Sequence, residues 1–238
     1  METIEGIILK KIAYKESSEI IYLYTNKGLV SVLVHGSKKI KSPYLNLTRI
    51  SNLVSLFVSG KDLLTLRDGE TKTAFPKLGL DIEKYTYISH VFELIYYFST
   101  HEHDHDKLYN FLLKIIQAVE TTNDYIPYIY MLELKLLFLL GVNPNLNTCN
   151  TCGSNQNLVF SVIEGSVFCD KHSPTGSYGE PILKYIRILY YFDLSKDQLP
   201  EVEFEIIKEV RFLLDNYYEY HLNYRSKARK MLKELIGY

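Results

Sequence analysis

The chain has 238 residues, of which 47% are apolar and 23% charged, with a formal net charge of −1. These values indicate an ordinary globular protein, long enough for two or three small domains. They argue against a membrane protein, because the most apolar segment, 131–142, is too short to cross a bilayer and carries Glu133 and Lys135. The first residues, 1–5, lack the basic start and apolar run of a secretion signal, so we expect a cytoplasmic location.

The charge is unevenly distributed along the chain. Residues 1–80 contain 12 Lys and Arg against 7 Asp and Glu, which gives +5. The remainder contains 15 basic and 21 acidic residues, which gives −6. A basic amino-terminal part on an acidic remainder is typical of a protein that meets a polyanion with one end, although some domains with this balance never contact nucleic acid.

Residues 1–80 have the pattern of short β-strands. The strands are predicted at 2–12, 19–24, 29–35, 53–59 and 63–67, with polar or glycine-containing turns between them. About five short strands in this length favour a small closed barrel such as the OB-fold. We therefore predict an OB-fold nucleic-acid-binding domain over residues 1–80.

A basic loop follows the third predicted strand. It contains Lys38, Lys39 and Lys41, and Arg49 comes shortly after it. Loops at the rim of an OB barrel often bind single-stranded nucleic acid, and lysines attract phosphates without sequence preference. Stacking faces for bases could come from Tyr14, Tyr22 or Tyr44. The alternative is a solvated loop whose lysines only keep a barrel edge soluble.

The apolar period changes from 2 to 3.6 after Pro76. Helices are predicted at 81–99, 107–121, 125–140, 181–192 and 203–235. The helix at 125–140 is apolar nearly all round, which predicts the central helix of a bundle. Together with the barrel, these segments indicate an α+β multidomain protein. The predicted helical domain has two parts, 81–145 and 179–238, and a cysteine-containing module at 146–178 is inserted between them.

The inserted module carries a pattern typical of a zinc site. Its four candidate ligands are Cys149, Cys152, Cys169 and His172, and they include every cysteine in the chain. Two close pairs on small turns, separated by a hairpin-sized insert, allow three thiolates and one imidazole to surround a tetrahedral Zn²⁺. We predict one structural Zn²⁺, because four protein ligands leave no open position for a catalytic water. The alternatives are buried thiols without a special role and a degenerate site that keeps its shape without metal.

Two other segments have residues that could carry chemistry. In the last predicted helix, Arg225, Arg229 and Lys230 form a cationic stripe after an aromatic patch, although cations near a helix carboxy terminus also complement its dipole. The segment 101–106, His-Glu-His-Asp-His-Asp, could hold a divalent metal, as in a metal phosphohydrolase, but it is also an ordinary polar connector between two helices. No phosphate-binding loop, dinucleotide-binding glycine pattern or nucleophile elbow occurs, so we expect a binding protein and not an enzyme.

Taken in order, these modules resemble the bacterial recombination mediator family RecO. The resemblance is carried by 5–10 (Glu-Gly-Ile-Ile-Leu-Lys), 14–20, 25–30 and the basic loop at 36–42. It continues at the cysteine turns, with Phe160-Ser161 and Gly165 between them, and ends at His221-Leu222 and 225–227 (Arg-Ser-Lys). Members with a metal site commonly use four cysteines, whereas here His172 would be the fourth ligand.

The resemblance implies a function in DNA repair. Proteins of this kind bind single- and double-stranded DNA, anneal complementary strands and work with RecR. They help load RecA onto strands coated by single-stranded-DNA-binding protein, whose acidic, apolar-ended tail docks on the helical part. It also implies a bacterial, nucleoid-associated protein. On this basis we predict DNA contacts by Lys38, Lys39, Lys41 and Arg49, with Arg225 and Lys227 as secondary candidates. The competing hypotheses are a zinc-ribbon module that binds RNA or the ribosome, and a protein scaffold that does not bind DNA.

Overall fold

The computed structural model describes residues 1–61, 63–100, 104–194 and 199–236. By its internal contacts the chain forms two compact units. The barrel unit is Met1–Thr122 together with the segment that begins at Ala228, and the helical unit is Asn123–Lys227. The four ranges predicted from the sequence follow the order of modules along the chain, whereas these two units follow contacts in space.

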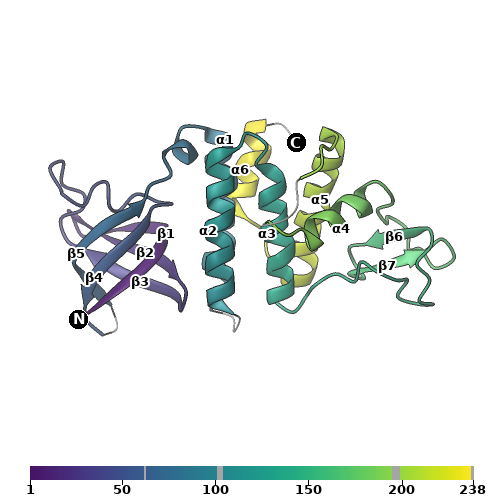
Figure 1. Cartoon of the computed structure of the whole chain (residues 1–238), viewed down its shortest axis with the longest axis horizontal. Coiled ribbons are helices and arrows are strands. Elements are labelled where there is room, and N and C mark those ends of the chain that lie inside the picture. The colour runs from purple at the N-terminus through teal and green to yellow at the C-terminus, as the bar shows by residue number, and fades with distance from the viewer. Residues whose placement is uncertain (62, 101–103, 195–198, 237–238) are drawn as a thin grey trace. The chain divides into compact units, whose positions relative to one another are not determined.

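The first five strands close into a barrel (Figure 1). They are β1 Glu2–Tyr14, β2 Ser18–Thr25, β3 Gly28–Val34, β4 Leu53–Ser59 and β5 Leu64–Thr73. Their order is β1-β2-β3-β5-β4, with β3 and β5 parallel and the other neighbours antiparallel. This five-stranded closed barrel confirms the OB-type prediction. The fifth strand continues to Thr73, beyond its predicted end at residue 67.

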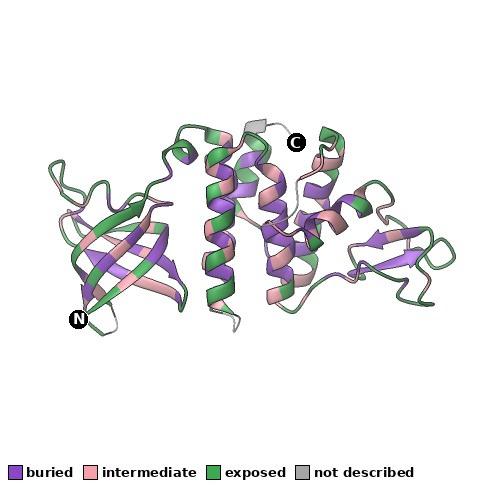
Figure 2. Cartoon of the chain, viewed as in Figure 1, coloured by how far each residue is buried: buried purple, intermediate pink, exposed green. Residues whose placement is uncertain are grey.

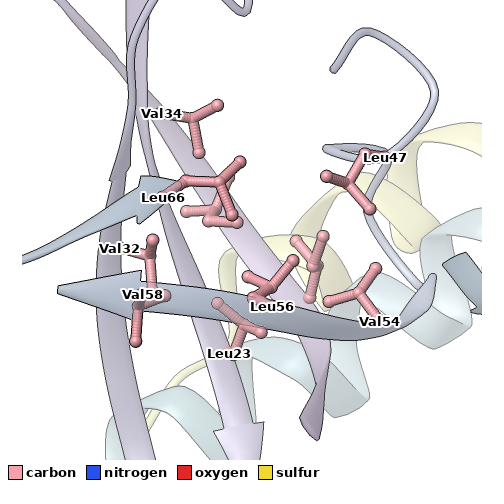
Figure 3. Packing of buried hydrophobic residues seen from close by; sticks show 10 residues of the cluster. Leu23, Val32, Val34, Leu47, Val54, Leu56, Val58 and Leu66 are labelled. Carbon is pink, nitrogen blue, oxygen red and sulfur yellow. The ribbon is translucent and has the colours of Figure 1, made fainter. Parts of the chain in front are cut away.

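The barrel interior is filled by apolar side chains that alternate along the strands, since every second residue points inward. The buried cluster consists of Ile8, Ile21, Leu23, Val32, Val34, Leu47, Val54, Leu56, Val58 and Leu66 (Figure 3). Within this cluster Leu47 alone comes from outside the strands, from the connection between β3 and β4. The loop that carries the basic residues is therefore fixed to the barrel core by one of its own side chains.

Helices complete the barrel unit. They are the short 3-10 helix η1 Pro76–Gly79 and the α-helices α1 Ile82–Phe98, α2 His105–Thr121 and α6 Lys227–Ile236. Each of these elements has a side chain that satisfies its first N–H groups: Asp81 accepts from Glu83 and Lys84 at α1, and Glu120 accepts from Lys77 and Leu78 at η1. Such caps define where the helices begin.

The helical unit is built around α3. Its elements are α3 Ile126–Leu139, β6 Leu158–Ser161, β7 Ser166–Cys169, α4 Ile182–Tyr191 and α5 Phe204–Leu222. The helix α3 packs against both α4 and α5, and most of its residues are buried (Figure 2). Its one acidic residue, Glu133, is also fully buried. The prediction of a central apolar helix is therefore confirmed. The strands β6 and β7 pair as an antiparallel hairpin in the insert between the two cysteine pairs.

The sequence prediction of a single helix over 203–235 is wrong. The structure has two helices, α5 and α6, separated at Asn223. Asn223 adopts a left-handed conformation with φ of 48°, and the N–H of Tyr224 donates to the carbonyl of Tyr218. Asparagine tolerates this conformation better than most residues and so commonly ends helices. The apolar pattern continues through the break between α5 and α6, so the pattern alone predicts one continuous helix.

Among the helices that the structure describes, none combines the length and the hydropathy that crossing a bilayer requires.

Candidate metal centre and nucleic-acid interface

The two cysteine pairs lie on tight turns next to the β6–β7 hairpin. In the first turn the N–H of Gly153 donates to the carbonyl of Cys149 at 2.9 Å, and Gly153 has a φ of 73°, which favours glycine. In the second, Cys169 ends β7 and its carbonyl accepts from the N–H of His172 at 2.9 Å. The first turn contributes the side chains of Cys149 and Cys152, and the second contributes those of Cys169 and His172. The four donor atoms therefore come together in one cluster.

The four donor atoms lie close enough together to hold one metal ion. All lie within 4.8 Å of one another. The Sγ atoms of Cys152 and Cys169 are 3.7 Å apart, and His172 Nδ1 lies 3.7 Å from Cys149 Sγ and 3.3 Å from Cys169 Sγ. Zinc bond lengths imply edges of roughly 3.5–3.8 Å in a tetrahedron of sulfur and nitrogen donors. The cluster could therefore bind a metal ion, and its donors are the types that zinc prefers.

The local electrostatics also favour a cation here. Burial acts to raise the pKa of Cys149, but N–H groups of Cys169, Cys152 and Thr151 and the ring of His172 outweigh it and lower that pKa to about 5. The N–H of Ser154 acts to lower the pKa of Cys152, yet the other two thiols and burial raise it. These contacts favour the thiolate form of Cys149, and its negative charge opposes ionisation of Cys152, an effect that a bound cation would offset.

The predicted nucleic-acid contacts in the barrel unit lie on the connection between β3 and β4. Lys38, Lys39, Lys41 and Arg49 are all exposed there. No carboxylate in the described part of the chain lies within 4.0 Å of their cationic groups, in contrast to Lys11, whose Nζ is 3.2 Å from Glu19. Four cations without a neutralising partner make a local positive field that a phosphate backbone could neutralise.

The connection between β3 and β4 is attached to the barrel by hydrogen bonds and buried side chains, and this attachment limits the movement of its backbone. The N–H of Lys38 donates to the carbonyl of Ser17 at 3.1 Å. Ser37 is fully buried and donates to the carbonyl of Val34, and Leu47 is 5% exposed in the barrel core. Lys38 therefore lies beside the β1–β2 turn, Lys39 and Lys41 follow it directly in the chain, and Arg49 comes two residues after Leu47.

Substitution of Leu47 by alanine tests this anchoring. We expect the barrel unit to lose roughly 2–5 kcal/mol of unfolding free energy, because the change removes buried methyl groups and leaves a cavity. The measurement is thermal or urea denaturation followed by circular dichroism. The matched control is Leu45→Ala in the same segment, where the leucine is 49% exposed and the expected change is small. Equal effects of the two substitutions would contradict the proposed anchoring.

Comparison with known proteins gives the family. The family model described as "Recombination protein O N terminal" matches residues 1–75, and "Recombination protein O C terminal" matches residues 79–230. The chain belongs to the RecO family. Curated relatives named "DNA repair protein RecO" match over nearly the full length of both chains. They include proteins of Bacillus cytotoxicus (28% identical, 98% of this chain and 97% of the relative), Shouchella clausii (28%, 97% and 93%) and Listeria monocytogenes (27%, 99% and 95%).

The secondary candidates of this RecO-family chain lie at the junction of α5 and α6. Arg225 pairs with Glu219, and this pairing raises the pKa of Arg225. Lys227 is exposed at the first position of α6. Both belong to the helical unit, whereas the loop cations belong to the barrel unit. Their DNA contacts remain a prediction.

The expected cationic stripe is not continuous on the surface. Arg229 is only 5% exposed, and its Nε donates to His90 Nε2 on α1 at 3.1 Å. The N–H of the preceding Ala228 donates to Glu93, also on α1. Arg229 therefore fastens α6 to α1 and is not accessible to a phosphate. Sequence periodicity could not reveal this, because the partner lies 139 residues away.

The described part of the acidic and histidine-rich segment serves the fold. Residues 101–103 of that segment lie outside the described residues. Asp104 caps α2 and pairs with Lys107, and His105 Nδ1 lies 3.0 Å from the hydroxyl of Tyr24 on β2. The side chain of Asp106 accepts from Asn110 one turn later. These contacts favour the connector interpretation over the metal-site hypothesis.

The three candidate stacking tyrosines differ in their surroundings. The ring of Tyr22 packs edge-on against Tyr96 of α1 at 5.3 Å, with Lys10 over the Tyr96 ring at 4.4 Å. Tyr44 is partly buried against the barrel core. Tyr14 remains at the β1–β2 end, where its ring contacts Lys15. Among the three, Tyr14 is therefore the best placed to stack on a base. The packing of Tyr96 and Lys10 around Tyr22 could not be predicted from the sequence.

Proposed function

We propose that this protein is a DNA-binding recombination mediator in DNA repair. It binds and anneals single-stranded DNA, and it helps load recombinase onto strands coated by single-stranded-DNA-binding protein. The observation that carries the proposal is an OB-type barrel with four uncompensated cations on one connection, in a chain of the RecO family. The names of the curated relatives support the DNA repair role.

The physical basis is neutralisation of the phosphate backbone. Lysines that contact phosphates bind many sequences alike and leave the edges of the bases free. Two DNA strands whose phosphate charges are neutralised by lysines repel each other less. Complementary strands bound to the protein can therefore form base pairs more easily. The protein needs no catalytic step of its own for this function, because base pairing supplies the driving force.

Besides DNA, the proposed binding partners are RecR and the acidic, apolar-ended tail of single-stranded-DNA-binding protein. RecA is an indirect partner, because it is loaded onto the DNA. The helical unit offers exposed large apolar side chains for a protein partner: Phe138 61%, Ile163 58%, Tyr191 56%, Phe204 58% and Tyr220 59%. Exposed apolar groups of this size are the kind that partner proteins cover.

The metal in this proposal is one structural Zn²⁺ held by Cys149, Cys152, Cys169 and His172. The donor set supports this choice, because three thiolates and an imidazole select zinc over the hard cations Mg²⁺ and Ca²⁺. Four protein ligands complete the tetrahedron and leave no position for a reacting water. When bound, the ion supplies a crosslink between the two turns and no chemistry.

An annealing assay tests the function. Two complementary labelled DNA strands are mixed with and without the protein, and duplex formation is followed by fluorescence, first with bare strands and then with strands coated by single-stranded-DNA-binding protein. We expect faster annealing in both conditions, and less acceleration as salt rises. A preference for RNA at equal salt would support the RNA-module alternative, and no acceleration with no binding would support the scaffold.

A further inference from the structure

Lys15, in the β1–β2 turn, has a backbone conformation that lysine rarely adopts. Its φ is 54°, in the left-handed region. Among the described residues the other non-glycine positions with positive φ are Ser51, Asn157 and Asn223, and asparagine tolerates this region far better than a long side chain does. Glycine or asparagine would fit the turn with less strain. A residue kept in a strained conformation points to a requirement for its side chain.

The side chain of Lys15 is presented to solvent. The residue is exposed, and its Nζ lies 5.4 Å from the ring centroid of Tyr14. No carboxylate in the described part of the chain lies within 4.0 Å of this Nζ, and the adjacent Glu16 is itself exposed without an ion pair in that part. The contact with Tyr14 holds the ammonium group in place without neutralising it.

The turn with Lys15 lies against the loop with the other lysines. The end of β1, the start of β2 and the end of β3 meet at the same end of the barrel, because β2 is antiparallel to both neighbours. The hydrogen bond from the N–H of Lys38 to the carbonyl of Ser17 joins the two segments directly. Two anchored loops thus present four unneutralised ammonium groups at one end: Lys15, Lys38, Lys39 and Lys41.

We propose that Lys15 is a further phosphate contact for single-stranded nucleic acid, and that it forms with the β3–β4 loop a two-sided phosphate clamp at this end of the barrel. Tyr14 acts as the positioning residue for the Lys15 ammonium group. The proposal rests on the proposed function, since it adds a contact to the same site. It accounts for a lysine at a backbone position that glycine would occupy at lower cost.

Replacement of Lys15 by glycine separates the charge from the fold, because glycine adopts the observed φ freely. We expect the affinity for an oligothymidylate to fall about fivefold at 0.1 M salt, and the salt slope of the logarithm of affinity to fall by about 0.7, the values for one lost phosphate contact. We expect the melting temperature to stay the same or rise, because backbone strain is relieved. Lys15→Arg, which keeps the charge and the strain, should bind like the wild type.

Lys27→Ala is the matched control. Lys27 is an exposed lysine on the β2–β3 turn, at the opposite end of β2, so its loss should leave affinity unchanged. If Lys15→Gly lowers the melting temperature, the binding assay is repeated with Lys15→Asn, because asparagine also tolerates a positive φ and carries no charge. Wild-type affinity in the variant that keeps its fold would overturn the clamp while leaving the proposed function intact. Absence of binding by the wild type at low salt would instead overturn the proposed function itself.

Discussion

Replacing Cys169 with serine is expected to destabilise the helical unit by more than about 4 kcal/mol, the range reached when a structural metal is lost. Cys169 is buried at the end of β7 and lies 3.7 Å from Cys152 Sγ and 3.3 Å from His172 Nδ1. Serine is a poor zinc ligand, so the proposed Zn²⁺ would lose one of its four ligands, and without the ion the remaining thiolates would repel one another. The metal-binding free energy of such a site is folding free energy.

The effect should extend beyond the hairpin, because the cysteine-containing module at 146–178 belongs to the helical unit. The ring of Phe160 on β6 stacks on Tyr217 of α5 at 6.1 Å, and His221 Nε2 lies 2.7 Å from the carbonyl oxygen of Val162. Arg187 of α4 donates from its Nε to the carbonyl of Leu146 at 2.8 Å. Loosening of the two turns therefore removes support from both α4 and α5.

The measurement is thermal denaturation combined with elemental analysis of zinc. We expect the wild type to carry one Zn²⁺ per chain, and the Cys169→Ser variant to have lost it and to melt on the order of 10 °C lower. The matched control is Lys171→Ala, an exposed residue between two ligands, which should keep both metal and stability. A verified metal-free wild type with an unchanged melting temperature would contradict a structural role for the ion.

Simultaneous replacement of Lys38, Lys39 and Lys41 by alanine is expected to weaken single-stranded DNA binding about a hundredfold at 0.1 M salt. Each lost phosphate contact lowers the salt slope by about 0.7 for a single strand, so three contacts lower it by about 2. The loss should be equal for unrelated sequences, because phosphates carry no sequence information. Fluorescence anisotropy of labelled strands over a range of salt concentrations measures both quantities.

The control for this variant removes the same charge from elsewhere in the barrel unit. Lys27, Lys77 and Lys114 are also exposed, and none belongs to the two loops at the proposed binding end. Their joint replacement by alanine changes the net charge equally, so it isolates the effect of position. The prediction is contradicted if both triple variants lose the same affinity, since binding would then depend on overall charge alone.

The features that sequence analysis predicted are those set by residues close together in the chain. The barrel strands follow from alternation over a few residues, as in Val54, Leu56 and Val58. The cluster of three cysteines and one histidine follows from two close pairs whose turns need only a few residues each. In both cases local spacing dictates geometry, so no knowledge of distant contacts was needed.

The features that it missed depend on distant partners. Arg229 has the periodicity of an exposed stripe, but its contact with His90 buries it. Tyr22 has the character of a stacking platform, but its ring packs against Tyr96 of α1 in a T-shaped arrangement. Packing between segments decides both, and one sequence carries no direct signal of it.

Binding of single-stranded DNA by the wild-type protein over a salt series is the most direct measurement. If the barrel end binds the phosphate backbone, labelled strands of unrelated sequence will bind with similar affinity at low salt, and the affinity will fall steeply as salt rises. Absence of binding at low salt, or an affinity that does not change with salt, would contradict a nucleic-acid-binding function of the barrel.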